Sequence, residues 1–93
     1  DQSGDQIYVM NADGSSLTAL GATSAGEPDW SPDGTQIGFQ TWRDNSKASE
    51  VYVMDADGSN QTRLTTDGSY NLGPRWSPDG SQIVFYSNQG WQR

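Results

Sequence analysis

Acidic side chains are the groups in this sequence best suited to chemistry, because it contains 12 Asp and Glu residues but no His and no Cys. The run Asp55-Ala-Asp-Gly58 resembles the start of a calcium-binding loop, in which oxygen ligands stand at positions 1, 3 and 5 and Gly at position 6. Here Gly stands at position 4, no acid follows at position 12, and the earlier copy of the run begins with Asn11. The spacing favours a hairpin turn over a metal site.

Catalysis is poorly supported by the remaining residues. A glycosidase needs two carboxylates in unequal environments, but so many acids make chance pairs common. Without His, catalysis by a Ser–His pair is excluded, and without Cys so is thiolate chemistry. We therefore predict no enzyme, no catalytic residue, no cofactor and no metal. The net charge of -7 also argues against nucleic acid and anionic membrane surfaces as partners.

The chain repeats itself with a period near 45 residues. Residues 7–20 align with 51–64 at 9 of 14 identical positions, and residues 27–41 align with 73–87 at 9 of 15. The two alignments have offsets of 44 and 46, so a two-residue insertion lies between the two matched segments of the second repeat. Periods of this length are typical of propeller blades and helical solenoids.

Local residue chemistry decides between these two architectures. Ile7–Met10 and Val51–Met54 are rich in β-branched and aromatic residues, as buried strands are. No segment has the apolar spacing of an amphipathic helix. Ser31-Pro-Asp-Gly34 and Ser77-Pro-Asp-Gly80 each predict a type I hairpin turn in which the final Gly has positive φ. The sequence therefore predicts an all-β protein with four short strands in each period.

Three recurring motifs carry a family resemblance: Pro-x-Trp-Ser-Pro-Asp-Gly, Gln-Ile-x-Phe and Tyr-Val-Met-x-Ala-Asp-Gly-Ser. Together they resemble the WD40-like repeat of TolB-type β-propellers, and they cover nearly the whole chain twice. The resemblance implies four-stranded antiparallel blades with strands a to d from the centre outwards. It divides the chain into a half blade (1–20), a full blade (27–65) and a second half blade (73–87). We expect two blades per chain, circularly completed between chains.

The expected strand order separates two kinds of connection. The b–c and d–a connections emerge on one face, and the uniform Asp-Gly turns on the other. Variable loops on a rigid scaffold are where binding is usually found. The expected strands are a at 28–30 and 74–76, b at 36–41 and 82–87, c at 7–10 and 51–54, and d at 16–20 and 60–65. The candidate binding residues on the variable face are Trp42, Arg43, Asn45, Tyr70, Asn71 and Trp91.

The four Trp residues fall into two classes. Trp30 and Trp76 occupy equivalent positions, and we expect them to pack between blades. Trp42 and Trp91 have no counterparts in the repeat, so they either contact a ligand or pack onto their own loops.

Asp29 and Arg75 are equivalent positions of opposite charge. If strand a lines a central channel, the two charges alternate around it. They are then either exposed charges of small effect or a channel wall that sets the register of the blades.

A scaffold for protein–protein interaction is the function that the sequence favours, and the resemblance adds a periplasmic or extracellular location. The alternative is a multivalent carbohydrate-binding propeller in which loop Trp residues stack on sugar rings. A third possibility is two blades of a larger propeller without activity of their own. Because two blades leave sheet faces and edges open, we expect the chain to pair with itself. A homotrimer with six blades is expected first, and a tetramer next.

Overall fold

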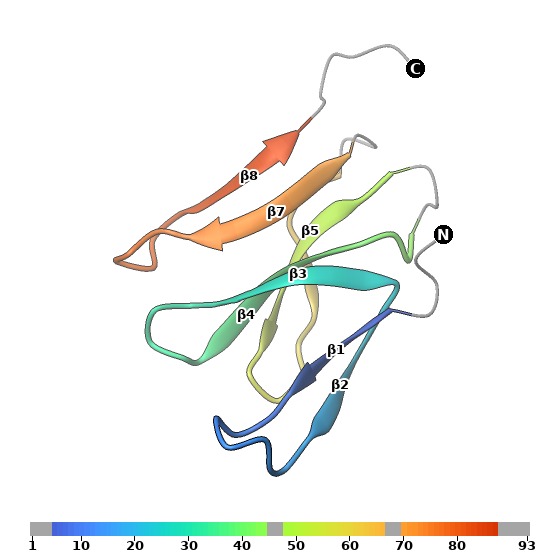
Figure 1. Cartoon of the computed structure of the whole chain (residues 1–93). Helices are drawn as coiled ribbons and strands as arrows, with labels where there is room; N and C mark the ends of the chain where they lie inside the picture. The colour runs from blue at the N-terminus through green and yellow to red at the C-terminus, as the bar shows by residue number, and fades with distance from the viewer. Residues whose placement is uncertain (1–4, 45–47, 67–69, 88–93) are drawn as a thin grey trace.

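The computed structural model describes residues 5–44, 48–66 and 70–87, which form three separate antiparallel sheets (Figure 1). The first sheet contains β1 (Gln6–Val9) and β2 (Thr18–Thr23). The second contains β3 (Ala25–Trp30), β4 (Gln36–Thr41), β5 (Glu50–Asp55) and β6 (Thr62–Arg63), paired in that order. The third contains β7 (Asn71–Trp76) and β8 (Ile83–Ser87).

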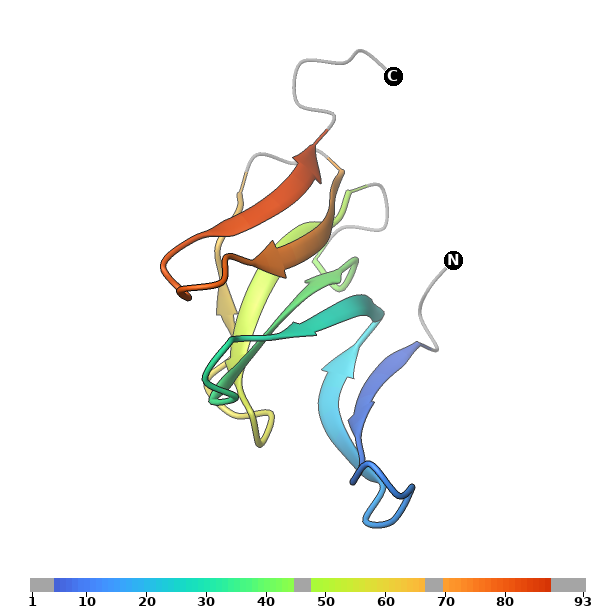
Figure 2. The same ribbon diagram turned by 60° about the vertical axis from the view of Figure 1, so that its left-hand side comes forward.

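The three sheets are successive blades that fan out from one another (Figure 2). β3 lies against β1 on one side and against β7 on the other. The order is therefore strands c and d, then a complete blade, then strands a and b. This confirms the all-β propeller fold with antiparallel blades. No helix in the described ranges is long and apolar enough to cross a membrane.

The first two blades are joined more closely than the sequence predicts. We expected the first half blade to end at residue 20 and the full blade to begin at 27, with a loop between them. Instead, β2 continues to Thr23, which pairs with Gln6, and β3 begins at Ala25, which pairs with Thr41. Ser24, with φ of 52°, turns the chain between the two strands. The prediction was wrong because this segment consists of small residues, which lack a strand pattern but let two blades approach closely.

Strand a carries a bulge in both repeats. The pairing register shifts between Gly26 and Asp29 in β3, and between Leu72 and Arg75 in β7. Equivalent residues within these bulges, Glu27 and Gly73, have φ of 52° and 63°. A bulge bends its strand and redirects the neighbouring side chains.

The hydrophobic core lies between the first two blades. Phe39 on β4 and Tyr52 on β5 stand opposite each other, and their ring centroids are 5.7 Å apart. Phe39 is fully buried, as expected for the face of a blade covered by its neighbour. The buried core residues are Ile7, Leu20, Ala22, Ala25, Ile37, Phe39, Tyr52 and Met54.

Trp76 forms the contact between the second and third blades. Its indole Nε1 donates a hydrogen bond to the Asp29 carbonyl at 3.2 Å and lies 3.3 Å from where a Cβ on Gly38 would stand. The expected packing of Trp76 between blades is therefore confirmed. Its counterpart Trp30 is 48% exposed, because the first blade, which it faces, has no strand b among the described residues to cover it.

The Ser-Pro-Asp-Gly turns have the predicted geometry. The N–H of Gly34 donates to the carbonyl of Ser31 at 2.9 Å, and the N–H of Gly80 donates to that of Ser77 at 2.9 Å. The φ angles of the two glycines are 76° and 78°. These are left-handed values that favour Gly over residues with a side chain.

We predict that Gly34→Ala and Gly80→Ala each destabilise the protein by about 1 kcal/mol, because Ala disfavours positive φ. A Cβ at Gly34 meets no atom within 4 Å, so backbone conformation is the cause there. Thermal melts measure the effect. Gly26→Ala is the matched control, because Gly26 also has open space but lacks a left-handed φ. Equal melting temperatures for Gly34→Ala and Gly26→Ala would contradict the turn assignment.

Candidate functional site

The connections between strands separate onto two ends of the fan, as Figures 1 and 2 show. One end carries the a–b and c–d turns, each built on an Asp-Gly pair. The other carries the b–c and d–a connections. We call the latter the connection face and define it by residues 42–44, 48–49, 64–66 and 70. Its loops differ in sequence from the equivalent segments of the first repeat, so it is the candidate binding surface.

Arg43 is an exposed basic residue on the connection face. Its guanidinium carbon lies 4.6 Å from the centroid of the Tyr52 ring, within range of a cation–π contact. Its Nη2 also donates to Oε1 of Gln61 at 2.5 Å. Beside it, Trp42 is half-buried, and its N–H donates to the carbonyl of Ser24 at 2.9 Å. The Arg43 guanidinium is therefore held against Tyr52, and the Trp42 backbone is held to Ser24.

The other predicted binding residues do not join them as a group. Tyr70 is half-buried and forms a parallel bridge with Ser49. Asn71 is fully buried, and its Nδ2 donates to the Ser49 carbonyl at 3.2 Å and to Oε1 of Glu50 at 3.0 Å. Asn71 therefore holds β7 to β5 and offers no surface to a partner. Asn45 and Trp91 lie outside the described residues.

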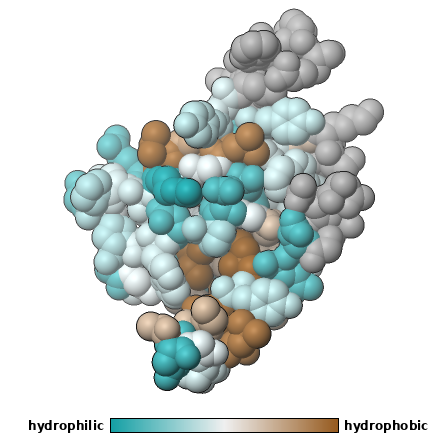
Figure 3. All heavy atoms as spheres, viewed as in Figure 1, coloured by the Kyte–Doolittle hydropathy of each residue, from teal (hydrophilic) through white to brown (hydrophobic). Residues whose placement is uncertain are grey.

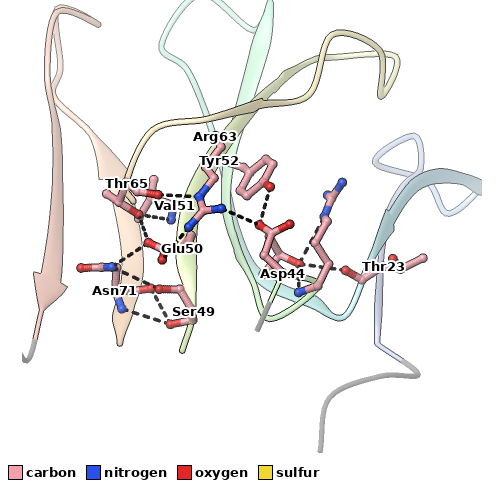
Figure 4. A network of polar contacts seen from close by, with 11 residues as sticks. Thr23, Asp44, Ser49, Glu50, Val51, Tyr52, Arg63, Thr65 and Asn71 are labelled. Atoms are coloured by element: carbon pink, nitrogen blue, oxygen red, sulfur yellow. Dashed lines mark hydrogen bonds and ion pairs between the residues drawn. The ribbon is translucent and has the colours of Figure 1, made fainter. Parts of the chain in front are cut away.

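A polar network that the sequence analysis missed lies beneath the connection face (Figure 4). Arg63 is at its centre and forms an ion pair with the buried Glu50, with Nη2 3.0 Å from Oε2. A second, longer pair joins Arg63 Nη1 to Oδ2 of Asp44 at 3.7 Å. The hydroxyl of Thr65 donates to Oε1 of Glu50, and that of Tyr52 donates to Oδ2 of Asp44 at 2.6 Å.

Through these ion pairs and hydrogen bonds, the network links the loop between β4 and β5 to β6 and β7. Burial raises the pKa of Tyr52, and its hydrogen bond to Asp44 raises this pKa further. Tyr52 therefore stays a hydrogen-bond donor. The sequence signal was a departure from the repeat, because the first repeat has Gln, Ala and Gly at the positions equivalent to Glu50, Arg63 and Thr65. The carboxylates of Asp44 and Glu50 are both bound by neighbouring side chains, which gives them a structural role.

The Asp-Gly turns use their carboxylates internally. In the Asp55–Gly58 run, Oδ1 of Asp57 accepts from the N–H of Ser59 at 2.9 Å. Asp79 is bound likewise: the N–H of Ser81 and the hydroxyls of Ser77 and Ser81 lower its pKa to about 2. The pKa is lowered in the same way at Asp13, Asp33 and Asp57. Within the described part of the chain, no three acidic side chains gather in a way that could hold a metal ion.

Asp29 and Arg75 connect neighbouring blades without pairing with each other. Oδ2 of Asp29 accepts the N–H of Trp76 at 2.9 Å, and Nη2 of Arg75 lies 3.4 Å from Oε1 of Glu27. Glu27 was not predicted from the sequence as a partner of Arg75. Because Arg75 and Glu27 are both about half exposed, their ion pair contributes little to stability. A role for Asp29 and Arg75 in lining a channel stays a prediction.

We predict that stability falls as the pH drops from about 4 to 2. The pKa of Asp79 in the folded chain, about 2, lies below its ordinary value of 3.8. The turn therefore contributes its full stability above about pH 4 and loses it as the carboxylate is protonated. Thermal melts across this range measure the effect. Asp79→Asn is expected to lower the melting temperature at pH 6. It is also expected to reduce the decrease in melting temperature between about pH 4 and 2.

Asp5→Asn is the control for this experiment, because Asp5 is exposed and its carboxylate has no hydrogen bond among the described residues. It is expected to behave as the unmodified chain does. Parallel pH profiles for Asp79→Asn and the unmodified chain would contradict the assigned role of the turn carboxylate.

Comparison with known proteins agrees with the repeat and the fold. The family described as TolB beta propeller domain matches residues 1–92. A solved structure from Agrobacterium tumefaciens, assigned as TolB, superposes with a TM-score of 0.78 at 32% sequence identity. The match covers 88% of this chain and 30% of that one, so the chain spans under a third of the length of that protein. Among curated proteins, none matches the chain.

Proposed function

Because this chain belongs to the TolB β-propeller family, we propose that it is a non-enzymatic scaffold for protein–protein interaction that binds partners through its connection face. Propellers of this family are generally non-catalytic. The proposal therefore rests on binding by a preformed surface rather than on a reacting group.

The observation that carries the proposal is the fixed position of Arg43. Its guanidinium stacks over Tyr52 while remaining exposed, and the ion pairs of Arg63 hold the strands beneath it. An Arg held in place loses less conformational freedom when it binds than a mobile one. Arg and Trp are also the residue types most enriched at the energetic centres of protein interfaces. Arg43 and Trp42 together supply such a centre.

We predict that peptides selected from a displayed random library against this protein lose affinity about tenfold with Arg43→Lys, which keeps the charge but removes the planar stacking group. Trp42→Ala is expected to have a similar effect. Gln82→Ala, an exposed change beside the a–b turn, is the matched control and is expected to bind normally. Melting temperatures verify that each variant folds.

Two outcomes would contradict this use of the connection face. Selected peptides that lose affinity only with Gln82→Ala would place binding on the turns instead. Binding on a glycan array that is lost with Trp42→Ala would favour the carbohydrate-binding alternative. That alternative needs an open indole face, whereas Trp42 is half-buried.

The second part of the proposal is that copies of this chain assemble into a closed ring. The two outer sheets each have two described strands, whereas the central blade has four. Large apolar side chains are exposed on these outer sheets, and such patches favour association. Half blades that complete one another form a head-to-tail contact, which either closes into a ring or polymerises.

We predict a trimer of about 30 kDa, three times the 10.1 kDa of one chain, because the family resemblance implies six blades. Light scattering after size exclusion measures the mass. A tetramer of about 40 kDa would mean eight blades, so that ring assembly would stand but the predicted number of three copies would be wrong. A folded monomer of 10.1 kDa would contradict ring assembly.

A further inference from the structure

We infer that the cleft between β1 and β3 receives β8 of a second copy, which pairs antiparallel with β1 so that Phe85 stands opposite Tyr8. The inference rests on the proposed ring assembly and specifies the strand contact through which one copy joins the next.

The cleft is a hollow of about 250 Å³ beside an open strand edge. Residues 7–10 line one side, and Pro28, Asp29 and Trp30 line the other. Among the described strands, β1 pairs only with β2, so its second edge is free to pair. Figure 3 shows hydrophobic residues gathered in this region, and a second group over β7 and β8.

The central blade shows what normally occupies the equivalent place. There, strand b (β4) pairs with strand c (β5), with Phe39 opposite Tyr52 and Ile37 opposite Met54. Tyr52 is 7% exposed and Met54 is fully buried. The repeat therefore provides a template for both partners and for their register.

The same residue types are exposed in the first blade, where strand b is missing among the described residues. Tyr8 and Met10, the counterparts of Tyr52 and Met54, are 54% and 59% exposed. β8 is the counterpart of β4 and pairs only with β7 in the described chain. Placed by the repeat, β8 of a second copy brings Phe85 opposite Tyr8 and Ile83 opposite Met10. This is the register of the central blade.

A second contact forms at the same junction. Within the chain, Trp76 covers Gly38. The corresponding residues between copies are Trp30, which lines the cleft, and Val84, which is 68% exposed. Val84 lines a hollow of about 300 Å³ on β7 and β8. Seating β8 beside β1 therefore brings Trp30 of one copy over Val84 of the other.

Charge also favours a second copy as the occupant. Asp29 lines the cleft, and Arg75 lines the hollow on β7 and β8. These two residues carry opposite charges, and each lines one of the two surfaces that the inference brings together. A second copy thus supplies the strand, the apolar cover and the opposite charge together.

Engineered disulfides test the register, because the chain has no Cys of its own. The matched pairs are Val9→Cys with Val84→Cys and Tyr8→Cys with Phe85→Cys. Directly opposite pairs alternate between close and wider spacing along antiparallel strands, so one of the two has the closer geometry for a disulfide. β1 and β8 lie at opposite ends of the fan (Figures 1 and 2), so these bonds form only between copies.

The control is Tyr8→Cys with Val84→Cys, a slip of one residue that points the two thiols to opposite faces. After mild oxidation, non-reducing gels are expected to show bands at multiples of the chain mass. At least one matched pair is expected to exceed the control by about tenfold in crosslinked protein, because opposed side chains lie within bonding reach.

Light scattering on the unmodified chain separates the possible failures. An assembled ring whose matched pairs crosslink no better than the control would overturn this register while ring assembly stands. A folded monomer would overturn both. Covalent products whose masses are not multiples of the chain mass would identify a different protein as the occupant and overturn the inference as well.

Discussion

Packing of one blade face against the next is the interaction on which the rest of this structure depends. The central blade contains Phe39, Tyr52 and Met54, and these side chains are buried only because β1 and β2 lie against them. On its other side, Trp76 lies against Gly38. Each strand of a blade is too short to be stable alone, and even a hairpin needs a covering layer. A blade therefore keeps its shape because of its neighbours.

The polar network beneath the connection face depends on the same packing. Glu50 is buried when β7 arrives beside β5, and a buried carboxylate is costly unless it is paired. Arg63, Thr65 and Asn71 each donate a hydrogen bond to it. Removing any one of these donors leaves a charge buried with fewer partners. The network thus makes the loops above it rigid while depending on correct seating of the blades below.

The sequence predicts this fold in considerable detail because the repeat states each motif twice. β4 begins and ends at the predicted residues, and both Ser-Pro-Asp-Gly turns have the predicted glycine geometry. The junction near Ser24 was missed because small residues pack closely without a strand pattern. Asn71 was expected at the surface because a polar residue in an insertion resembles a loop. Its burial depends on Glu50, which is distant in sequence, and single-sequence patterns do not report such contacts.

The difference between Gly38 and Val84 has a consequence for symmetry. The contact of Trp76 with Gly38 is tight, since an added Cβ would stand 3.3 Å from the indole nitrogen and the indole would have to shift by a few tenths of an ångström. In the proposed ring, the equivalent place between copies would hold Val84, whose branched side chain would make Trp30 sit farther out than Trp76 does. Two kinds of blade junction would then alternate around the proposed ring. A six-bladed ring of this kind would have true threefold rather than sixfold symmetry, and its two junctions could change independently of each other.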